Sequence, residues 1–214
     1  MEKTDSIINL AQSLRLPVFE SYAKYVKPDM SIEDALIELM SEEQGQRHSA
    51  MVKRRISSAG LPNGKTVDTF KIVPSIPHLK QEQVDSLASC KFIDGKMNVC
   101  ALGGSGTGKT HLMAAIGREA IQLGYTVKFI RVSDMLMSLH EAYTEKRLGA
   151  MMKSLLKIDL LELDELGYIS LSVKKSQLLF DVIAKRSEAG GSTFVTSNYE
   201  NQNLNKIRTF TLRD

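Results

Sequence analysis

The sequence predicts an α/β fold, in which a parallel β-sheet with flanking helices follows a small all-helical N-terminal domain. Two observations predict this class. Short apolar runs alternate with helical periodicity in the second part of the chain, as expected for a parallel sheet that is covered on both faces. Residues 5–59, by contrast, show only helical spacing of apolar residues.

The composition is typical of a folded globular protein. The chain has 214 residues, of which 43% are hydrophobic and 25% charged, and its formal net charge is +3. The two cysteines, Cys90 and Cys100, lack metal-type spacing with the histidines, so we expect reduced thiols and a cytoplasmic location. The N-terminus lacks a signal-peptide pattern, and no apolar run is long enough to predict a membrane span.

A helix is predicted from Ser31 onward. Ser31 and Asp34 resemble a capping box, and the apolar residues that follow have helical spacing. Acidic residues come first in this region and basic residues follow, ending in Lys53, Arg54 and Arg55. Two interpretations stay open: the order complements the helix dipole, or the basic end contacts DNA phosphates.

A domain boundary is expected where turn-forming residues gather. Residues 57–66, SSAGLPNGKT, show no periodic pattern. We therefore expect a helical domain over 1–60 for DNA or partner binding, a linker over 61–79, and a nucleotide-binding domain over 80–214.

The second part of the chain alternates between strands and helices. Strands are expected at 97–104, 126–132, 159–164 and 192–197. Helices are expected at 109–123, closed by Gly124, after Ser133 as a cap, and from Ser172. In the second of these helices, Met135 and Met137 are expected in the core.

Residues 103–110, GGSGTGKT, match the phosphate-binding pattern G-x-x-x-x-G-K-[ST]. Its glycines let backbone N–H groups converge on phosphate oxygens, and the helix that follows favours an anion at its N-terminus. Lys109 can reach the β- and γ-phosphates, and the Thr110 hydroxyl can bind Mg²⁺. The alternative is a glycine-rich turn that binds no nucleotide. We expect the nucleotide to contact Gly103, Gly104, Ser105, Gly106, Thr107, Gly108, Lys109, Thr110 and His111.

Polar residues end two of the later predicted strands. Asp164 can hold Mg²⁺ through water, and Glu165 beside it can act as a general base on the attacking water. Asn198 follows the last strand, where it can contact the γ-phosphate or that water. The alternative for each position is an ordinary turn residue.

Together, the stretches GTGKTHL, DELGYISL and TSN, with the helical region and the segment KTVDTF, resemble the IstB-like ATP-binding proteins over about residues 6–200. These are helper ATPases of bacterial insertion sequences, related to the DnaC helicase loader within the AAA+ group. The resemblance implies a P-loop NTPase of the AAA+ type with ATP and Mg²⁺ as ligands. It implies double-stranded DNA and a DDE-type transposase as partners, with self-assembly on DNA. Lys109 and Thr110 correspond to Walker A, Asp164 and Glu165 to Walker B, and Asn198 to sensor 1.

The sequence departs from the family pattern at Glu162, where the family has an aliphatic residue in the Walker B strand. A carboxylate in a buried strand is costly unless it is protonated or paired. Alternation places Glu162 on the same strand face as Asp164. A basic neighbour or Lys109 could partner it there, or the substitution is a tolerated or damaging one.

The second departure lies after Asn198, where the chain reads YENQNLNKIRTFTLRD while family members continue. The missing part supplies the arginine finger, the final core strand and the sensor-2 region, and Arg208 and Arg213 match no family position. We therefore expect a C-terminally truncated copy, with the strand at 97–103 at a sheet edge. ATP binding is then a safer expectation than hydrolysis.

Other functions fit parts of the pattern. A DnaC-like helicase loader in DNA replication differs from a transposition helper in partner and not in chemistry. A small-molecule kinase also uses a phosphate-binding loop, but no arginine-rich lid segment is evident in the sequence. A truncated ATP-binding or DNA-binding remnant without hydrolysis is a third alternative. Lys146 and Arg147 are further candidates for DNA contact.

Overall fold

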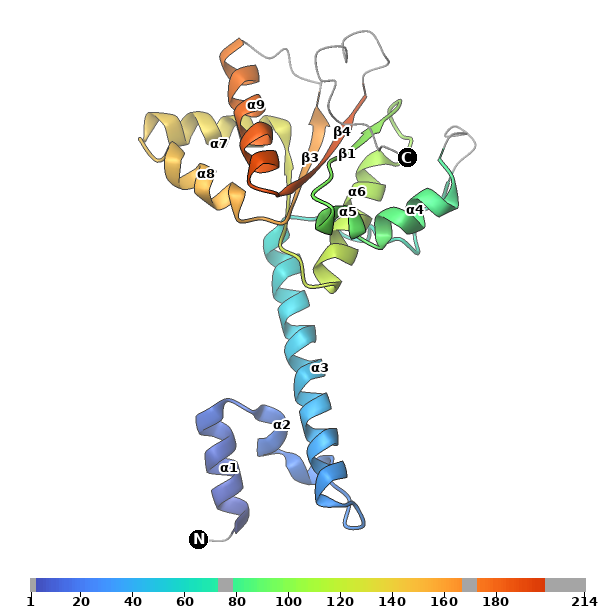
Figure 1. The fold of residues 1–214 in the computed structure, drawn as a ribbon, viewed down its shortest axis with the longest axis vertical. Coiled ribbons are helices and arrows are strands. Elements are labelled where there is room, and N and C mark those ends of the chain that lie inside the picture. The colour runs from blue at the N-terminus through green and yellow to red at the C-terminus, as the bar shows by residue number, and fades with distance from the viewer. Residues whose placement is uncertain (1–2, 73–78, 167–172, 199–214) are drawn as a thin grey trace. The chain divides into compact units, whose positions relative to one another are not determined.

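The computed structural model describes residues 3–72, 79–166 and 173–198. The chain divides into two compact units, Met1–Arg54 and Arg55–Asp214. The first unit is helical, and the second contains a parallel sheet with flanking helices (Figure 1). The predicted fold class is therefore confirmed.

The first unit consists of helices α1 (Lys3–Leu14), α2 (Pro17–Glu20), the 3-10 helix η1 (Tyr22–Lys24) and most of α3 (Ile32–Ala59). The predicted cap of α3 is present. The Ser31 hydroxyl accepts the Asp34 backbone N–H at 3.1 Å and donates to the Asp34 carboxylate at 2.8 Å. Helix α2 is tied to α3 because the buried Glu43 carboxylate accepts the Val18 backbone N–H at 3.0 Å.

The sheet of the second unit contains four strands in the order β1-β4-β3-β2. They are β1 (Val99–Leu102), β2 (Val127–Arg131), β3 (Leu160–Leu166) and β4 (Ser192–Ser197). All neighbouring strands are parallel, so their carboxyl ends meet at one edge of the sheet. All four predicted strands are confirmed, and β1 is an outer strand among those that the structure describes.

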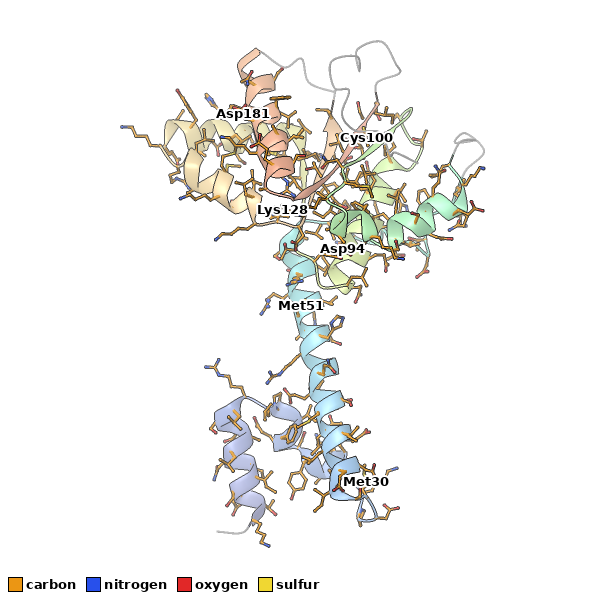
Figure 2. All side chains as sticks on the ribbon, in the orientation of Figure 1. Met30, Met51, Asp94, Cys100, Lys128 and Asp181 are labelled. Carbon is orange, nitrogen blue, oxygen red and sulfur yellow. The ribbon has the colours of Figure 1, made fainter. Side chains whose placement is uncertain are left out.

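Helices cover both faces of the sheet, as Figure 1 shows. Helix α6 (Lys109–Gln122) packs on one face, while α7 (Val132–Thr144), α8 (Leu148–Leu156) and α9 (Val173–Glu188) gather on the other. Because strand side chains alternate, Leu161 and Leu163 enter the core beneath α7, and Leu160 and Glu162 do not belong to that cluster. Figure 2 shows side chains crowding the space between sheet and helices.

Some expectations about the helices were wrong. Ser133 does not cap α7, because the helix begins one residue earlier at Val132 and the Ser133 hydroxyl bonds Asp134 within it. Met135 is fully buried as expected, but Met137 is 61% exposed. The predicted helix start at Ser172 lies outside the described residues. Helices α4 (Gln81–Ala88) and α5 (Lys91–Asp94), like α8, were not predicted.

The end of α3 and the segment after it are held to the rest of the second unit by side-chain hydrogen bonds to backbone carbonyls. The Arg55 guanidinium donates to the Tyr125 carbonyl at 3.1 Å, and Arg118 donates to the Pro62 carbonyl at 2.7 Å. Ala59 and Leu61 are buried. The second unit therefore begins within α3, before the turn-rich segment.

A buried guanidinium joins three elements at the end of the sheet opposite the phosphate-binding loop. Arg186 of α9 is fully buried and donates to the Leu155 and Ser192 carbonyls, the second at 2.7 Å. Burial lowers its pKa to about 10.

No helix in the described parts of the chain is long and apolar enough to cross a membrane.

Candidate functional site

The phosphate-binding loop connects β1 to α6, as predicted. Gly106 and Gly108 have φ angles of 77° and 88°, a left-handed conformation that glycine adopts without strain. A side chain at Gly108 would also meet the Phe70 ring, since an added Cβ would lie 3.2 Å from Phe70 Cε2. Both glycines are therefore needed for the shape of this loop.

The Lys109 ammonium is held by the loop itself. Its Nζ donates to the Gly103 carbonyl at 2.8 Å and to the Gly104 carbonyl at 2.6 Å. Burial lowers the pKa of Lys109, and the nearby Asp164 carboxylate opposes that shift. The lysine thus occupies the space that the loop encloses and has carbonyl oxygens as its partners.

Asp164 is the point at which the loop helix meets the sheet. Its Oδ1 accepts the Thr110 hydroxyl at 3.0 Å and the Thr196 hydroxyl at 2.5 Å. Asp164 is 2% exposed, so this carboxylate is fixed by two hydroxyl donors in a shielded position. Residues from α6, β3 and β4 therefore converge at the carboxyl end of the sheet.

Glu165 follows in an unusual backbone conformation. Its φ angle is 62°, which is uncommon for a residue with a side chain, and the register between β3 and β4 shifts between Leu163 and Leu166. Its backbone N–H donates to the Thr196 hydroxyl at 3.1 Å. Its carboxylate lies 3.6 Å from the Arg131 guanidinium at the end of β2, and both side chains are partly exposed.

Asn198 directly follows β4, which lies between β1 and β3. It is half-buried. The chain order alone places it at the same edge of the sheet as Asp164 and Glu165, because parallel strands end on one side. The structure therefore gathers the predicted residues of three segments at one edge.

Glu162 lies on the same face of β3 as Asp164 but deeper in the unit. It is fully buried, and neither carboxylate oxygen has a hydrogen-bond partner among the described residues. Of the partners considered for it, Lys109 instead bonds the loop carbonyls, and no basic side chain within the described residues hydrogen-bonds to Glu162. Burial raises the pKa of Glu162 well above its ordinary value, and Asp164 adds to this, while the Gly117 backbone and Arg118 oppose it.

Helix α6 leaves room for this carboxylate at Gly117. An added Cβ at Gly117 would lie 2.7 Å from Glu162 Oε2 and 2.8 Å from Oε1. A carbon and an oxygen that are not bonded to one another clash sterically at these distances. The glycine and the buried acid therefore fit one another sterically.

His111, in the first turn of α6, contacts the segment that precedes the domain core. Its Nε2 lies 3.1 Å from both the Thr66 carbonyl and the Thr69 hydroxyl. Because a carbonyl only accepts, this nitrogen carries the proton. The Phe70 ring lies edge-on to the imidazole with centroids 5.5 Å apart. Residues 66–70 thus pack against the start of the loop helix.

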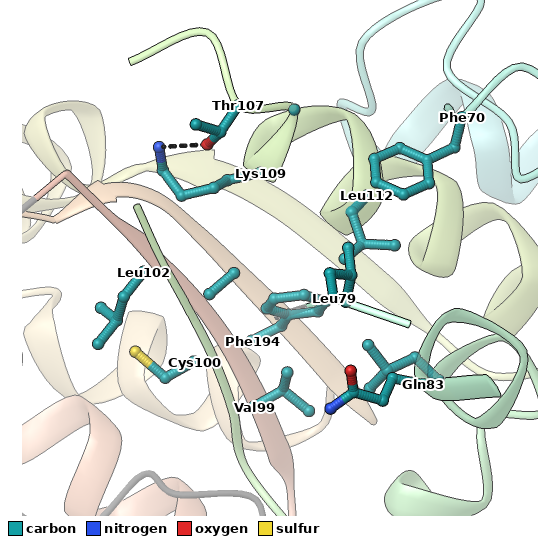
Figure 3. A pocket seen from close by; sticks show the side chains of 13 residues that line it. Phe70, Leu79, Gln83, Val99, Cys100, Leu102, Thr107, Lys109, Leu112 and Phe194 are labelled. Carbon is teal, nitrogen blue, oxygen red and sulfur yellow. Dashed lines mark hydrogen bonds between the residues drawn. The ribbon is translucent and has the colours of Figure 1, made fainter. Parts of the chain in front are cut away.

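A mainly apolar cavity of about 210 Å³ adjoins the loop (Figure 3). Phe70 and Leu112 lie near its loop end, and Val99 and Phe194 line the sheet side. Gln83 contributes a polar group from α4. The full lining comprises Phe70, Leu79, Gln83, Leu87, Val99, Cys100, Ala101, Leu102, Thr107, Gly108, Lys109, Leu112 and Phe194.

Sequence patterns missed three residues of this region. Thr196 belongs to the stretch TSN, in which only Asn198 was assigned a role, although the Thr196 hydroxyl contacts both Asp164 and Glu165. Arg131 belongs to no sequence motif, and its contact with Glu165 arises from the pairing of β2 with β3. Phe70 ends the segment KTVDTF within the predicted linker, and no role at the site was assigned to it.

Comparisons with known proteins agree with this arrangement. A family model described as IstB-like ATP binding protein matches residues 11–207. The ATP-binding protein of insertion sequence IS5376 from Geobacillus stearothermophilus is 34% identical over 180 residues, which cover 82% of this chain and 71% of that relative.

Solved structures share the fold of the sheet unit. The DnaC helicase loader matches with a TM-score of 0.59 and 23% identity, over 66% of this chain and 80% of its own. AMPPCP-bound DnaA from Aquifex aeolicus matches with a TM-score of 0.59 and 21% identity, over 72% of this chain and 47% of its own. At these identities the likeness establishes the fold alone.

Proposed function

Because the chain belongs to the family of IstB-like ATP-binding proteins, we propose that it binds ATP with Mg²⁺ and serves a bacterial transposition system as a DNA-associated AAA+ helper. The observation that carries the ATP site is the 3.0 Å contact between the Thr110 hydroxyl and the Asp164 carboxylate. It joins the phosphate-binding loop to the acidic strand end. A glycine-rich turn without ligand would not require this pairing.

Each part of the site has a role in this proposal. The loop amides from Gly103 to Gly108 bind the phosphates, and Lys109 exchanges its carbonyl partners for β- and γ-phosphate oxygens. Thr110 and Asp164 hold Mg²⁺, for which two adjacent oxygen donors are suited. The bound ion would neutralise charge on the phosphates. The apolar cavity beside Phe70 accepts the nucleobase.

Glu165 and Asn198 are proposed to act on the attacking water. Glu165 would orient and deprotonate that water as a general base, with Asn198 positioning it or the γ-phosphate. The contact with Arg131 holds the Glu165 carboxylate in the present structure. Hydrolysis in our proposal therefore requires that this contact be given up.

Double-stranded DNA and a transposase are the partners that we propose, with assembly of several copies on DNA in the cytoplasm. The name of the IS5376 relative supports the association with an insertion sequence. Basic residues at two places, Lys53–Arg55 and Lys146–Arg147, are candidates for phosphate contacts. A DnaC-like helicase loader is the second candidate function, because the DnaC structure shares the fold over 80% of its own chain.

The test is titration of a fluorescent ATP analogue with Mg²⁺, together with ATP turnover measured with and without duplex DNA. Lys109→Ala should abolish saturable binding, whereas Lys185→Ala, which alters an exposed lysine of α9, should leave it unchanged. Equal binding by all three proteins would refute the ATP site. Binding without turnover would indicate a protein that binds the nucleotide without hydrolysing it.

The identity of the protein partner is tested in a separate experiment. Pull-down of the ATP-loaded chain is compared between the transposase of its insertion sequence and a replicative helicase. ATP-dependent capture of the transposase supports the transposition helper. Capture of the helicase alone favours the loader.

A further inference from the structure

The cavity beside the phosphate-binding loop has a polar group at each end. Lys109 lies at the loop end, and Gln83 of α4 lies at the opposite end near Val99 (Figure 3). The sheet side between them is apolar, because Val99 and Phe194 form it. Cys100 also lines the cavity, but it packs against the core on the other face of the sheet. A ligand that extends from the loop along this wall therefore meets the Gln83 amide.

The start of α4 determines how the Gln83 amide is oriented. Its Oε1 accepts the Lys80 backbone N–H at 2.9 Å. Because a backbone N–H only donates, the atom that contacts it must be the amide oxygen and not the nitrogen. The Nε2 group keeps its two N–H donors, for which the described residues provide no hydrogen-bond partner. Gln83 is exposed, so these donors are open to a ligand.

We propose that Gln83 favours adenine over other purine bases by donating a hydrogen bond from Nε2 to adenine N1. This selection deepens the proposed function and rests on it, because the loop must hold the triphosphate. The ribose is attached at N9 of a purine, and the Watson–Crick edge lies farthest from that atom. With the phosphates in the loop, this edge points toward the far end of the cavity, where Gln83 lies.

Adenine differs from guanine and hypoxanthine at the atom that Gln83 would contact. N1 is a hydrogen-bond acceptor in adenine, whereas in the other two bases it carries a proton and would face the Gln83 donors with a donor of its own. That arrangement leaves both groups without a partner, and a site that hydrogen-bonds its ligand discriminates against the mismatched analogue. Because Gln83 is exposed and the bond is neutral, we expect a preference of roughly three- to tenfold.

The substitution Gln83→Glu tests this assignment with little change in shape. One carboxylate oxygen can still accept the Lys80 N–H, while the other replaces the amide donor by an acceptor. The variant should bind ATP roughly three- to tenfold more weakly and GTP and ITP more tightly, since a carboxylate accepts from N1–H. Gln81→Glu is the matched control on α4. Gln81 donates to Asp85 and is not among the described residues that line the cavity, so this variant should behave as wild type.

The measurement is displacement of a fluorescent ATP analogue, with Mg²⁺ present, by unlabelled competitors. ITP lacks the exocyclic amino group of GTP, so its comparison with ATP isolates the edge that carries N1. Inorganic tripolyphosphate has no base and should compete equally well in wild type, Gln83→Glu and Gln81→Glu. For wild type, 1-deaza-ATP, which lacks the N1 acceptor, should compete more weakly than 7-deaza-ATP, which keeps it.

Several results would overturn the role of Gln83. These are equal affinities of wild type for ATP and ITP, an unchanged ratio in Gln83→Glu, or the same change of ratio in Gln81→Glu. Loss of affinity with 7-deaza-ATP in place of 1-deaza-ATP would overturn the contact with N1. Failure of the ATP site itself has a different signature, because wild type would then resemble Lys109→Ala and bind neither the analogue nor tripolyphosphate.

Discussion

Replacing Glu162 by Gln should stabilise the sheet unit relative to wild type, and this difference in unfolding free energy should grow as pH rises. Glu162 is 0% exposed and its two oxygens lack partners among the described residues. Its pKa is raised well above the ordinary value, so the native state keeps the proton after the unfolded state has lost it. Stability associated with this group is therefore present below the ordinary glutamate pKa and is lost as pH rises toward the native pKa.

The magnitude follows from the burial. While pH lies between the unfolded and native pKa values, wild type should lose about 1.4 kcal/mol relative to Glu162→Gln for each pH unit. Even the neutral acid is buried without a hydrogen bond, which costs roughly 1–3 kcal/mol. Glu162→Leu should therefore be more stable than wild type even at low pH.

The assay is urea unfolding of the three proteins at a series of pH values. Because the chain contains no tryptophan, far-UV circular dichroism is the suitable signal. Parallel pH profiles for wild type and Glu162→Gln would show that Glu162 titrates alike in both states. A wild type that gains stability relative to Glu162→Gln with rising pH would show an ionised, paired carboxylate and refute the reasoning.

Three further changes test other contacts. Gly117→Ala should destabilise the chain by roughly 1–3 kcal/mol, and by less in a Glu162→Ala background, because the added Cβ would lie 2.7 Å from a Glu162 oxygen; additive unfolding energies would contradict this steric fit. Arg186→Met should cost about 3 kcal/mol or more in urea unfolding by leaving buried carbonyls unpaired, and a neutral result would mean that water replaces them. Arg131→Ala should raise basal ATP turnover roughly two- to fivefold by freeing Glu165 from a partly exposed ion pair, whereas lower turnover would give Arg131 a direct part in the reaction.

The phosphate-binding loop and the strands could be predicted because their signals are local. The phosphate-binding pattern itself specifies glycine at position 108, and each strand is a short apolar run. Asp164 was predictable for the same reason, as an acid at the end of such a run. The contact between Thr110 and Asp164 then follows from the parallel order of the strands.

The remaining features depend on tertiary structure. Helices α4 and α5 are short, with 8 and 4 residues, so their periodicity is too brief to distinguish them from loops. The left-handed conformation of Glu165 coincides with the register shift between β3 and β4, which the sequence of one strand alone does not reveal. Ser133 was misjudged because the first turn of α7 continues directly from β2 and leaves no separate capping position.

The parallel sheet also links ATP to the integrity of the whole unit. Strand β1 pairs with β4, so Val99 lies beside Phe194, and the loop that follows β1 is completed by side chains from distant parts of the chain. Such non-local pairing forms slowly and late in folding. A ligand that binds only the finished arrangement stabilises it by about 2.7 kcal/mol when its concentration is one hundred times the dissociation constant. Nucleotide supply would then govern how much of this protein persists in a form that resists proteolysis.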